Sequence, residues 1–149
     1  MRKRHLLLAL SAALASTLAA TPTWAQDSFK IGLLLPLTGP FASTGKQLEA
    51  AARLYIAQNG DTVGGKKVQL VVKDDTGVAD VSKRLAQELV VNDKVNVLAG
   101  FGLTPLAMAS APIATQSKTP LVVMAAATSS ITEASPYICL LYTSPSPRD

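Results

Sequence analysis

The strongest constraint on the fold is a regular alternation of short apolar runs with helical patterns. Four short runs rich in apolar residues predict strands: 29–35, 67–73, 95–99 and 120–125. The first is almost continuous, as expected for a strand that is covered on both faces. Three stretches with helical spacing separate them: 44–59, 78–90 and 105–117. Strands that alternate with helices through short connections predict βαβ units. We therefore expect an α/β fold, an open parallel sheet with helices on both faces.

Apolar stripes predict which sides of the first two helices are buried. In the first helix the stripe comprises Leu48, Ala51, Ala52, Tyr55 and Ile56, and in the second Val78, Val81, Leu85, Ala86, Leu89 and Val90. Asn59 and Gly60 should end the first helix. In the third helix Pro112 predicts a kink or a later helix start.

The N-terminus reads as a secretory signal peptide. Arg2, Lys3 and Arg4 precede an apolar run over 6–20, and a small-residue cleavage site follows at Ala25. The alternative is an N-terminal membrane anchor, but the run is short and rich in Ala and Ser, and a spanning helix needs about 20 predominantly apolar residues. We expect an exported, periplasmic protein cleaved near Ala25.

Composition narrows the possible chemistry. Three of the 14 Lys and Arg residues lie in the leader, which leaves 11 against 10 Asp and Glu, interspersed along the chain. That balance gives no electrostatic footprint for nucleic acid. The single histidine, His5, lies in the leader, and Cys139 is the single cysteine. The mature chain therefore cannot form an intramolecular disulfide, a Ser-His-Asp triad or a typical His/Cys zinc site.

The turn after the first strand resembles a phosphate-binding loop only superficially. Between Gly39 and Gly45 lie five residues, where the Walker spacing needs four. Gln47 follows Lys46, where a Ser or Thr should hold magnesium. Phosphate binding is not expected there.

Two later turns are better candidates, because ligands of open parallel sheets lie beyond the carboxyl ends of the strands. After the third strand, Thr104 could cap a helix with Pro105 at its first position, and such a helix N-terminus attracts a carboxylate. The alternative is that Thr104 only caps its own helix. After the fourth strand, residues 125–130 repeat the scheme, and Ser130 with Glu133 has capping-box spacing.

A third strand end carries two carboxylates. Asp74 and Asp75 could act as acid and base groups, but carboxylates in this position more often cap turns.

These residues together resemble a known family. The leader, KIGLLLPLTGPFASTG, GGKKVQLVVKDD, LAGFGLTPLAMASAPIA and VVMAAATSSITEASPYI are similar to the N-terminal lobe of periplasmic substrate-binding proteins that serve branched-chain amino acid ABC transporters. The resemblance covers the leader and about residues 28–138. It implies a type I periplasmic binding fold with two α/β lobes that close on the ligand, no catalysis, no cofactor, and a membrane permease as partner.

The resemblance also suggests ligand-binding residues. Thr104 takes the place of the hydroxyl that binds the ligand carboxylate, Ala126 would offer a carbonyl to an ammonium group, and Thr128 its hydroxyl and N–H. Thr44 stands where some members carry an aromatic residue that covers the ligand. The ligand could therefore be a branched-chain amino acid or another small carboxylate, including an aromatic acid. The first-lobe disulfide of many amino-acid binders is missing.

The last eleven residues do not continue the family pattern. We predict three segments: a signal peptide over 1–25, an incomplete N-terminal lobe over 26–138, and an unrelated, non-native tail over 139–149. A natural flexible tail is the alternative. Two further functions remain open: an exported sensor domain of the same fold, which neighbouring kinase or chemoreceptor genes would favour, and a secreted flavodoxin-like enzyme.

Overall fold

A computed structural model describes residues 28–141, so the predicted leader, its cleavage site and residues 142–149 lie outside the described residues. The elements follow in the order β1 (Ser28–Leu35), α2 (Ala42–Asn59), β2 (Thr62–Val63), β3 (Lys66–Asp74), α3 (Ala79–Val91), β4 (Val97–Gly100), α4 (Thr104–Ser117), β5 (Leu121–Val123), α5 (Ser130–Glu133) and β6 (Ile138–Leu140). The four predicted strands and three predicted helices all form, with their ends shifted by a few residues.

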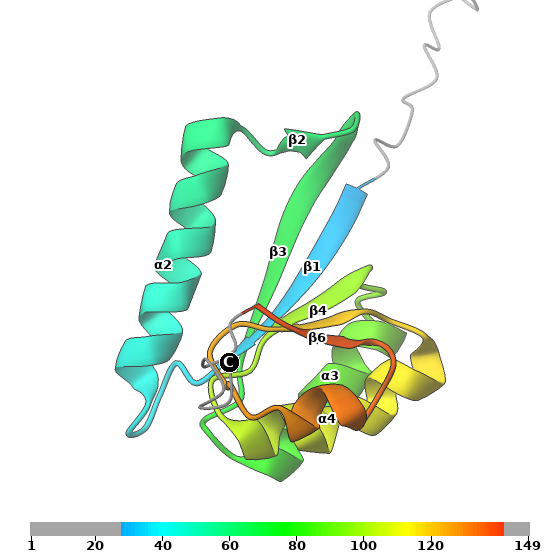
Figure 1. Ribbon diagram of the computed structural model, residues 1–149. Coiled ribbons are helices and arrows are strands. Elements are labelled where there is room, and N and C mark those ends of the chain that lie inside the picture. Colours follow the sequence, from blue (N-terminus) through cyan, green and yellow to red (C-terminus); the bar gives the residue numbers. More distant parts are fainter. Residues whose placement is uncertain (1–27, 142–149) are drawn as a thin grey trace, which may run out of the picture.

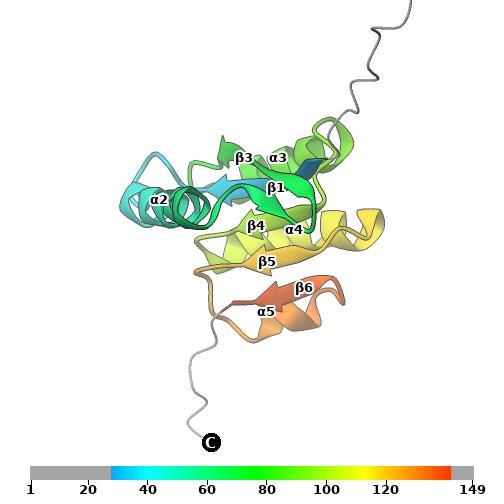
Figure 2. The ribbon, with the colours of Figure 1, turned by 90° about the horizontal axis from the view of Figure 1, so that it is seen from above.

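The strands form one six-stranded sheet in the order β2-β3-β1-β4-β5-β6 (Figure 2). Every neighbouring pair is parallel except β2 and β3, so the predicted parallel sheet is confirmed. The short β2 hairpin was not predicted. Its turn is Gly64-Gly65, both with positive φ (58° and 78°), which is the signal that a two-residue hairpin requires.

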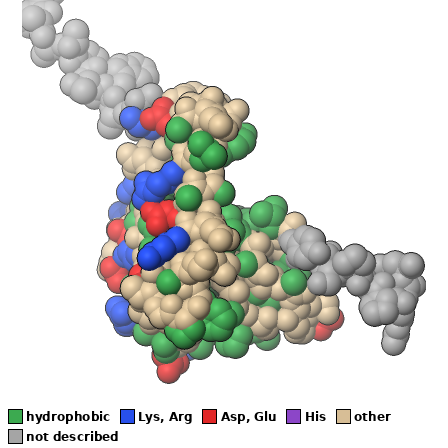
Figure 3. Space-filling model, turned by 90° about the vertical axis from the view of Figure 1, so that its left-hand side faces the viewer, with side chains coloured by type: hydrophobic (Ala, Val, Ile, Leu, Met, Phe, Trp, Pro, Cys, Tyr) green, Lys and Arg blue, Asp and Glu red, His purple; other side chains and the backbone are tan. Residues whose placement is uncertain are grey.

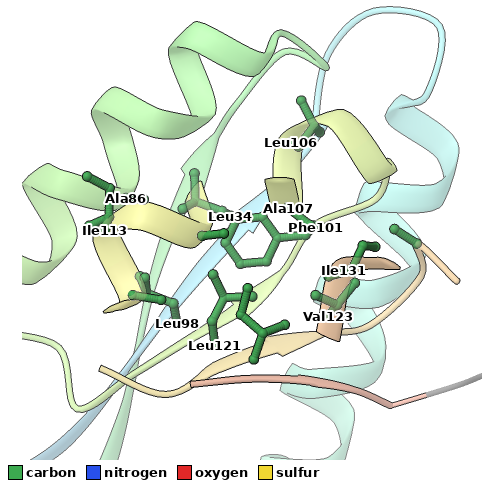
Figure 4. Close-up of a cluster of buried hydrophobic side chains, with 14 of the residues drawn as sticks. Leu34, Ala86, Leu98, Phe101, Leu106, Ala107, Ile113, Leu121, Val123 and Ile131 are labelled. Atoms are coloured by element: carbon green, nitrogen blue, oxygen red, sulfur yellow. The ribbon is translucent and has the colours of Figure 1, made fainter. Parts of the chain in front are cut away.

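Helices cover both faces of the sheet, also as predicted. Side chains alternate along β1, so Leu34 lies on the face of α3 and α4 while Leu33 and Leu35 lie on the face of α2. Figure 1 shows α2 on one side of the strands and α3 and α4 on the other. The larger buried cluster fills the α3/α4 side (Figure 4), and its fully buried members include Leu34, Leu89, Leu98, Phe101, Leu121, Val123 and Ile131.

The face under α2 is only partly covered. Its buried cluster consists of Leu33, Leu35 and Ala99. The expected stripe of α2 is therefore half wrong: Leu48, Ala52 and Ile56 are half-buried, but Ala51 and Tyr55 are exposed, Tyr55 to 67%. Among the described elements α2 packs mainly on β1, and its far side meets solvent. Two cavities of about 310 Å³ each open along this side, lined by residues of α2, β1, β2 and β3.

Helices α3 and α4 pack closely because small side chains meet at their interface. Ser82 and Ala86 of α3 are fully buried, and the hydroxyls of Ser82 and Ser110 lie 3.5 Å apart. The predicted stripe of α3 fails at Val78, which precedes the helix in an extended conformation and is 48% exposed. A residue outside the helix does not follow the helical periodicity.

Pro112 does not delay the start of α4, because the helix runs unbroken from Thr104 to Ser117. A proline inside a helix removes one N–H and so leaves the carbonyl four residues earlier without its helical donor. Here that carbonyl belongs to Met108, whose residue is exposed, as is Pro112 itself. Water can take the place of the missing donor, and the predicted later start is wrong.

Ion pairs link β3 to the end of α3. The ammonium of Lys73 lies 2.7 Å from a carboxylate oxygen of Glu88 and 2.7 Å from one of Asp93. Burial acts to lower the pKa of Lys73, but the two carboxylates outweigh it and raise the pKa above its ordinary value. On the face shown in Figure 3, basic and acidic side chains are interspersed without a broad field of one sign.

The last described strand crosses the predicted boundary at 138. Cys139 and Leu140 pair with Val122 and Val123 of β5, so the first two residues of the predicted tail take part in the sheet. Cys139 is exposed and its thiol is free. Whether the sequence beyond Ile138 is native stays a prediction.

Within residues 28–141, no helix combines the length and the apolar character that crossing a membrane requires.

Candidate ligand-binding site

The turns after β4 and β5 lie side by side at the carboxyl edge of the sheet. The two strands pair in parallel and end together, with Gly100 opposite Val123. Beyond the pairing, Met124 donates its N–H to the carbonyl of Gly100 at 2.7 Å, and Ala126 donates to that of Phe101 at 3.2 Å. The two loops therefore leave the sheet as neighbours, as the parallel topology predicted.

Each loop contributes a threonine, and the two hydroxyls meet. The oxygens of Thr104 and Thr128 lie 2.7 Å apart, a short hydrogen bond between residues 24 positions apart in sequence. Thr128 is exposed and Thr104 half-buried, so the pair opens to solvent. A hydroxyl carries one proton, so the bond uses one of two protons and leaves the other able to donate to a ligand.

The hydroxyl of Thr104 does not cap its own helix. The N-cap of α4 is Leu103, with an extended backbone, and no side chain caps the helix. Thr104 is the first helical residue, and Pro105 is the second, one position later than predicted. The expectation that Thr104 is an N-cap is therefore wrong. The alternative that it serves only its own helix is wrong too, because its hydroxyl bonds to Thr128 instead.

Backbone N–H groups beside the two hydroxyls are further hydrogen-bond donors. Within the described part of the chain, no acceptor takes the N–H of Gly102, Leu103 or Thr104, whereas the next N–H of the helix, that of Leu106, is bonded to Leu103. Unpaired N–H groups at the start of a helix carry a positive partial charge. The first turn of α4 contains no acidic residue that would oppose an anion. Sequence reasoning identified this helix start but missed the contribution of Gly102 and Leu103.

The helix after Thr128 is short, as the sequence suggested. Helix α5 has four residues, from Ser130 to Glu133, and no side chain caps it. The capping box between Ser130 and Glu133 does not form, because Ser130 is already helical and Ser129 holds the cap position.

The other two predicted site residues, Ala126 and Thr44, are not hydrogen-bonded to the hydroxyl pair among the described residues. Ala126 is buried two positions before Thr128, and its N–H is held by Phe101. Thr44 is exposed in the first turn of α2, on the other face of the sheet, and among the described residues no hydrogen bond joins it to Thr104 or Thr128. The ligand-binding roles of all four residues stay predictions.

Asp74 performs the turn-capping role that its position suggested. One carboxylate oxygen accepts the N–H groups of Leu37 and Thr76, each at 2.8 Å, and the other accepts the hydroxyl of Thr38 at 2.7 Å. Partial burial acts to raise the pKa of Asp74, but these hydrogen bonds outweigh it and hold the pKa below its ordinary value. This carboxylate thus joins the β1–α2 turn to the β3–α3 turn beside the candidate site.

Asp75 differs from its neighbour because it is completely buried. One oxygen accepts the N–H of Gly77 at 3.0 Å, while the other has no partner among the described residues. Burial raises the pKa of Asp75, the charge of Asp74 adds to this, and the Gly77 hydrogen bond opposes it. Across residues 28–141, no cluster of three His, Cys, Asp or Glu side chains could hold a metal ion.

The hollows under α2 are separate from this edge. Neither of the two 310 Å³ cavities is lined by Thr104 or Thr128. The candidate site is thus an open surface with convergent donors rather than a closed pocket.

Comparison with known proteins identifies the family of this fold. The family model for periplasmic binding proteins matches residues 28–148. This chain belongs to that family.

Several relatives bind small molecules for ABC transporters. The Leu/Ile/Val-binding protein homolog 6 of Brucella abortus (strain 2308) is 46% identical over 132 residues, which cover 88% of this chain and 34% of the relative. A solute-binding protein from Rhodopseudomonas palustris BisB5, solved with 3,4-dihydroxybenzoic acid, is 62% identical with a TM-score of 0.76, and the match covers 76% of this chain and 31% of that one. A second, from R. palustris HaA2 and solved with p-hydroxybenzoic acid, is 45% identical with a TM-score of 0.73 and the same coverage.

The chain spans about a third of the length of these relatives. The likeness extends over the described sheet and its helices. The predicted fold, the first lobe of a type I periplasmic binding protein, is therefore confirmed.

Proposed function

We propose that this chain is the first ligand-binding lobe of a periplasmic solute-binding protein of an ABC importer, and that it binds the carboxylate of a small aromatic acid of the hydroxybenzoate class. The observation that carries the proposal is the hydroxyl pair of Thr104 and Thr128 beside three backbone N–H groups that have no acceptor among residues 28–141. Such a set of neutral donors suits a carboxylate, since hydrogen bonds to a charged acceptor are the strong ones.

The choice of an aromatic acid follows from the relatives. The 62% identical relative was solved with 3,4-dihydroxybenzoic acid, and the 45% identical one with p-hydroxybenzoic acid. Thr44 agrees with this choice, because the aromatic residue that covers an aliphatic ligand in some family members is absent here.

A branched-chain amino acid is the second candidate. The Brucella relative, 46% identical, carries a name from the leucine, isoleucine and valine binders. In that case the carbonyl of Ala126 would accept a hydrogen bond from the ligand ammonium, a group that a hydroxybenzoate lacks.

The partners and location are also part of the proposal. A signal peptide cleaved near Ala25 would export the chain to the periplasm, where a membrane permease would receive its ligand. The relatives are binding proteins rather than enzymes. Delivery requires that the ligand be released unchanged, so no residue of the site acts as acid, base or nucleophile.

Binding to this chain should be weak. Because the chain spans about a third of its relatives' length, it supplies only part of the ligand contacts. A millimolar dissociation constant corresponds to about −4 kcal/mol, half the binding free energy of a micromolar complex. We expect the affinity of the full 149-residue chain to lie in the millimolar range.

An NMR titration of the full chain tests the proposal. We expect 4-hydroxybenzoate to shift the amide signals of Thr104 and Thr128 to saturation, and its uncharged analogue 4-hydroxybenzamide to leave them in place. Thr104→Val removes the hydroxyl at nearly constant volume and should weaken binding about tenfold. Thr62→Val, in the distant β2 hairpin, is the matched control and should bind like the wild type.

The alternatives give different results. Saturable shifts with leucine but not with 4-hydroxybenzoate would favour the amino-acid candidate. Shifts confined to residues other than these two loops, or none with any carboxylate, would refute the site.

A further inference from the structure

The turn between β4 and α4 contains an unusual backbone conformation. Phe101 has φ of 62°, in the left-handed region that bulky residues rarely adopt. Such a conformation persists only where the surrounding structure imposes it, and it is frequent at functional sites. The preceding Gly100 has φ of 116°, and a Cβ there would lie 2.1 Å from the carbonyl oxygen of Leu34. The backbone of Gly100 thus packs closely against β1 just before the chain turns toward the candidate site.

The backbone of Phe101 is bonded on both sides. Its N–H donates to the carbonyl of Leu34 in β1 at 2.9 Å, and its carbonyl accepts the N–H of Ala126 at 3.2 Å. One residue therefore links the central strand, the β4–α4 turn and the loop that carries Thr128.

The side chain of Phe101 is anchored in the core. It is completely buried within the cluster on the α3/α4 side, which also contains Leu34, Leu106 and Ile131. Figure 4 shows the ring in the middle of the labelled side chains. Because Leu106 belongs to the first turn of α4 and Ile131 to α5, the ring lies in one cluster with the helices that follow both threonines.

We propose that Phe101 is the positioning residue of this site: its buried ring and left-handed backbone set the distance between the hydroxyls of Thr104 and Thr128. Thr104 follows Phe101 by three positions. Thr128 follows Ala126, the residue whose N–H donates to the carbonyl of Phe101, by two. A change at Phe101 is thereby transmitted to both hydroxyls at once. The proposal rests on the proposed function for its ligand, but its structural part can be tested without one.

Two substitutions distinguish the contribution of the Phe101 ring from that of its backbone conformation. Phe101→Gly removes the ring but accepts a positive φ more easily than phenylalanine does, so any loss comes from the missing anchor. Phe101→Leu keeps a smaller apolar anchor. The matched control is Leu89→Ala, a completely buried residue of α3 in the same cluster, which lies near Gly32 in the middle of β1 and Val95 just before β4.

The measurement is a two-dimensional amide NMR spectrum of each full-chain variant, followed by titration with 4-hydroxybenzoate. We expect Phe101→Gly to displace the signals of Thr104 and Thr128 and to weaken binding by about tenfold or more, since a misplacement of about 1 Å is costly at a recognition site. Phe101→Leu should bind with an affinity between those of the wild type and Phe101→Gly, about threefold weaker than the wild type. Leu89→Ala should keep both signals and the affinity of its folded fraction.

Each outcome decides the proposal. Unchanged Thr104 and Thr128 signals and affinity in folded Phe101→Gly would overturn it, and so would equal displacement of both signals in Leu89→Ala. If Phe101→Gly does not fold, Phe101→Leu decides by the same criteria. If the wild-type chain does not bind 4-hydroxybenzoate, the proposed ligand fails, and the two amide signals still report whether Phe101 positions the threonines.

Discussion

The two faces of the sheet differ in how completely they are packed. On the α3/α4 side a continuous cluster of fully buried side chains runs from Leu89 to Ile131 (Figure 4). On the α2 side the buried hydrophobic cluster of the described residues consists of Leu33, Leu35 and Ala99, and Tyr55 of α2 faces solvent. Dense packing holds side chains in single rotamers, and sparse packing leaves room for rearrangement.

The difference shows where precise positioning is possible. The helices after both threonine loops contribute Leu106 and Ile131 to the packed cluster, and Phe101 joins them there. The α2 side reaches the same edge of the sheet chiefly through Asp74, which holds the β1–α2 turn by hydrogen bonds. The proposed binding site for a small anion thus lies on the densely packed side of the molecule.

The largest expected effect is on a leucine of the packed side. Leu121→Ala in β5 removes a completely buried side chain, and we expect the free energy of unfolding to fall by about 2–5 kcal/mol, from lost burial and the resulting cavity. Leu54→Ala in the exposed part of α2 should change it by less than about 0.5 kcal/mol. Urea unfolding followed by circular dichroism measures both free energies. Equal losses in the two variants would contradict the difference in packing between the faces.

The next effect concerns the link between the faces. Asp74→Ala removes the acceptor of two N–H groups and one hydroxyl, so the free energy of unfolding should fall by about 1–3 kcal/mol. Asp61→Ala, whose ion pair with Lys67 lies in solvent, is the control and should unfold at nearly the wild-type urea midpoint. A result in which both variants behave alike would remove Asp74 as a specific link.

The same carboxylate predicts a pH dependence. Its pKa is lower in the folded than in the unfolded chain, so its contribution is present above the unfolded value of about 3.9 and is lost as pH falls toward the folded pKa. Below about pH 4 the unfolding free energy of Asp74→Ala should therefore decline less steeply than that of the wild type.

Asp75 predicts a pH dependence of stability opposite in sign to that of Asp74. Burial raises its pKa in the folded state, so the folded chain retains a proton that the unfolded chain loses, and wild-type stability falls as pH rises from about 3.9 through the folded pKa. Asp75→Asn cannot ionise and escapes this loss. The unfolding free energy of the variant minus that of the wild type should increase with pH across that window, and a difference independent of pH would contradict the assignment.

The smallest effect is expected on the solvent side of α2. The exposed Arg53 and the half-buried Glu49 form an ion pair of 2.7 Å one helical turn apart. Arg53→Ala should lower the free energy of unfolding by less than about 0.5 kcal/mol, with most of that removed by salt. A larger loss would mean that α2 depends on its surface charges more than on its contact with β1.

The sequence predicted the fold where local patterns decide structure. Apolar runs bounded by Gly, Pro and Asp located β1, β3, β4 and β5, and the parallel order placed the two threonine loops at one edge. The β2 hairpin also has a local signal, the Gly64-Gly65 pair, in which both residues have positive φ.

The failures have physical causes outside the local pattern. Thr104 had the composition of an N-cap, but its hydroxyl bonds to a residue 24 positions away, a partner that no local pattern reveals. Tyr55 fits an apolar stripe, yet burial depends on what packs over the helix, and among the described residues little covers it. Phe101 occupies a conformation that its residue type disfavours, so only the surrounding contacts could indicate it.

Carboxylate recognition by the threonine pair can be tested with a crystal structure of the full chain soaked with 4-hydroxybenzoate. We expect a carboxylate oxygen within about 2.6–3.2 Å of the hydroxyls of Thr104 and Thr128, above the N-terminus of α4. A ligand seated instead in the apolar cavities beside α2, with the two hydroxyls still bonded only to each other, would contradict it.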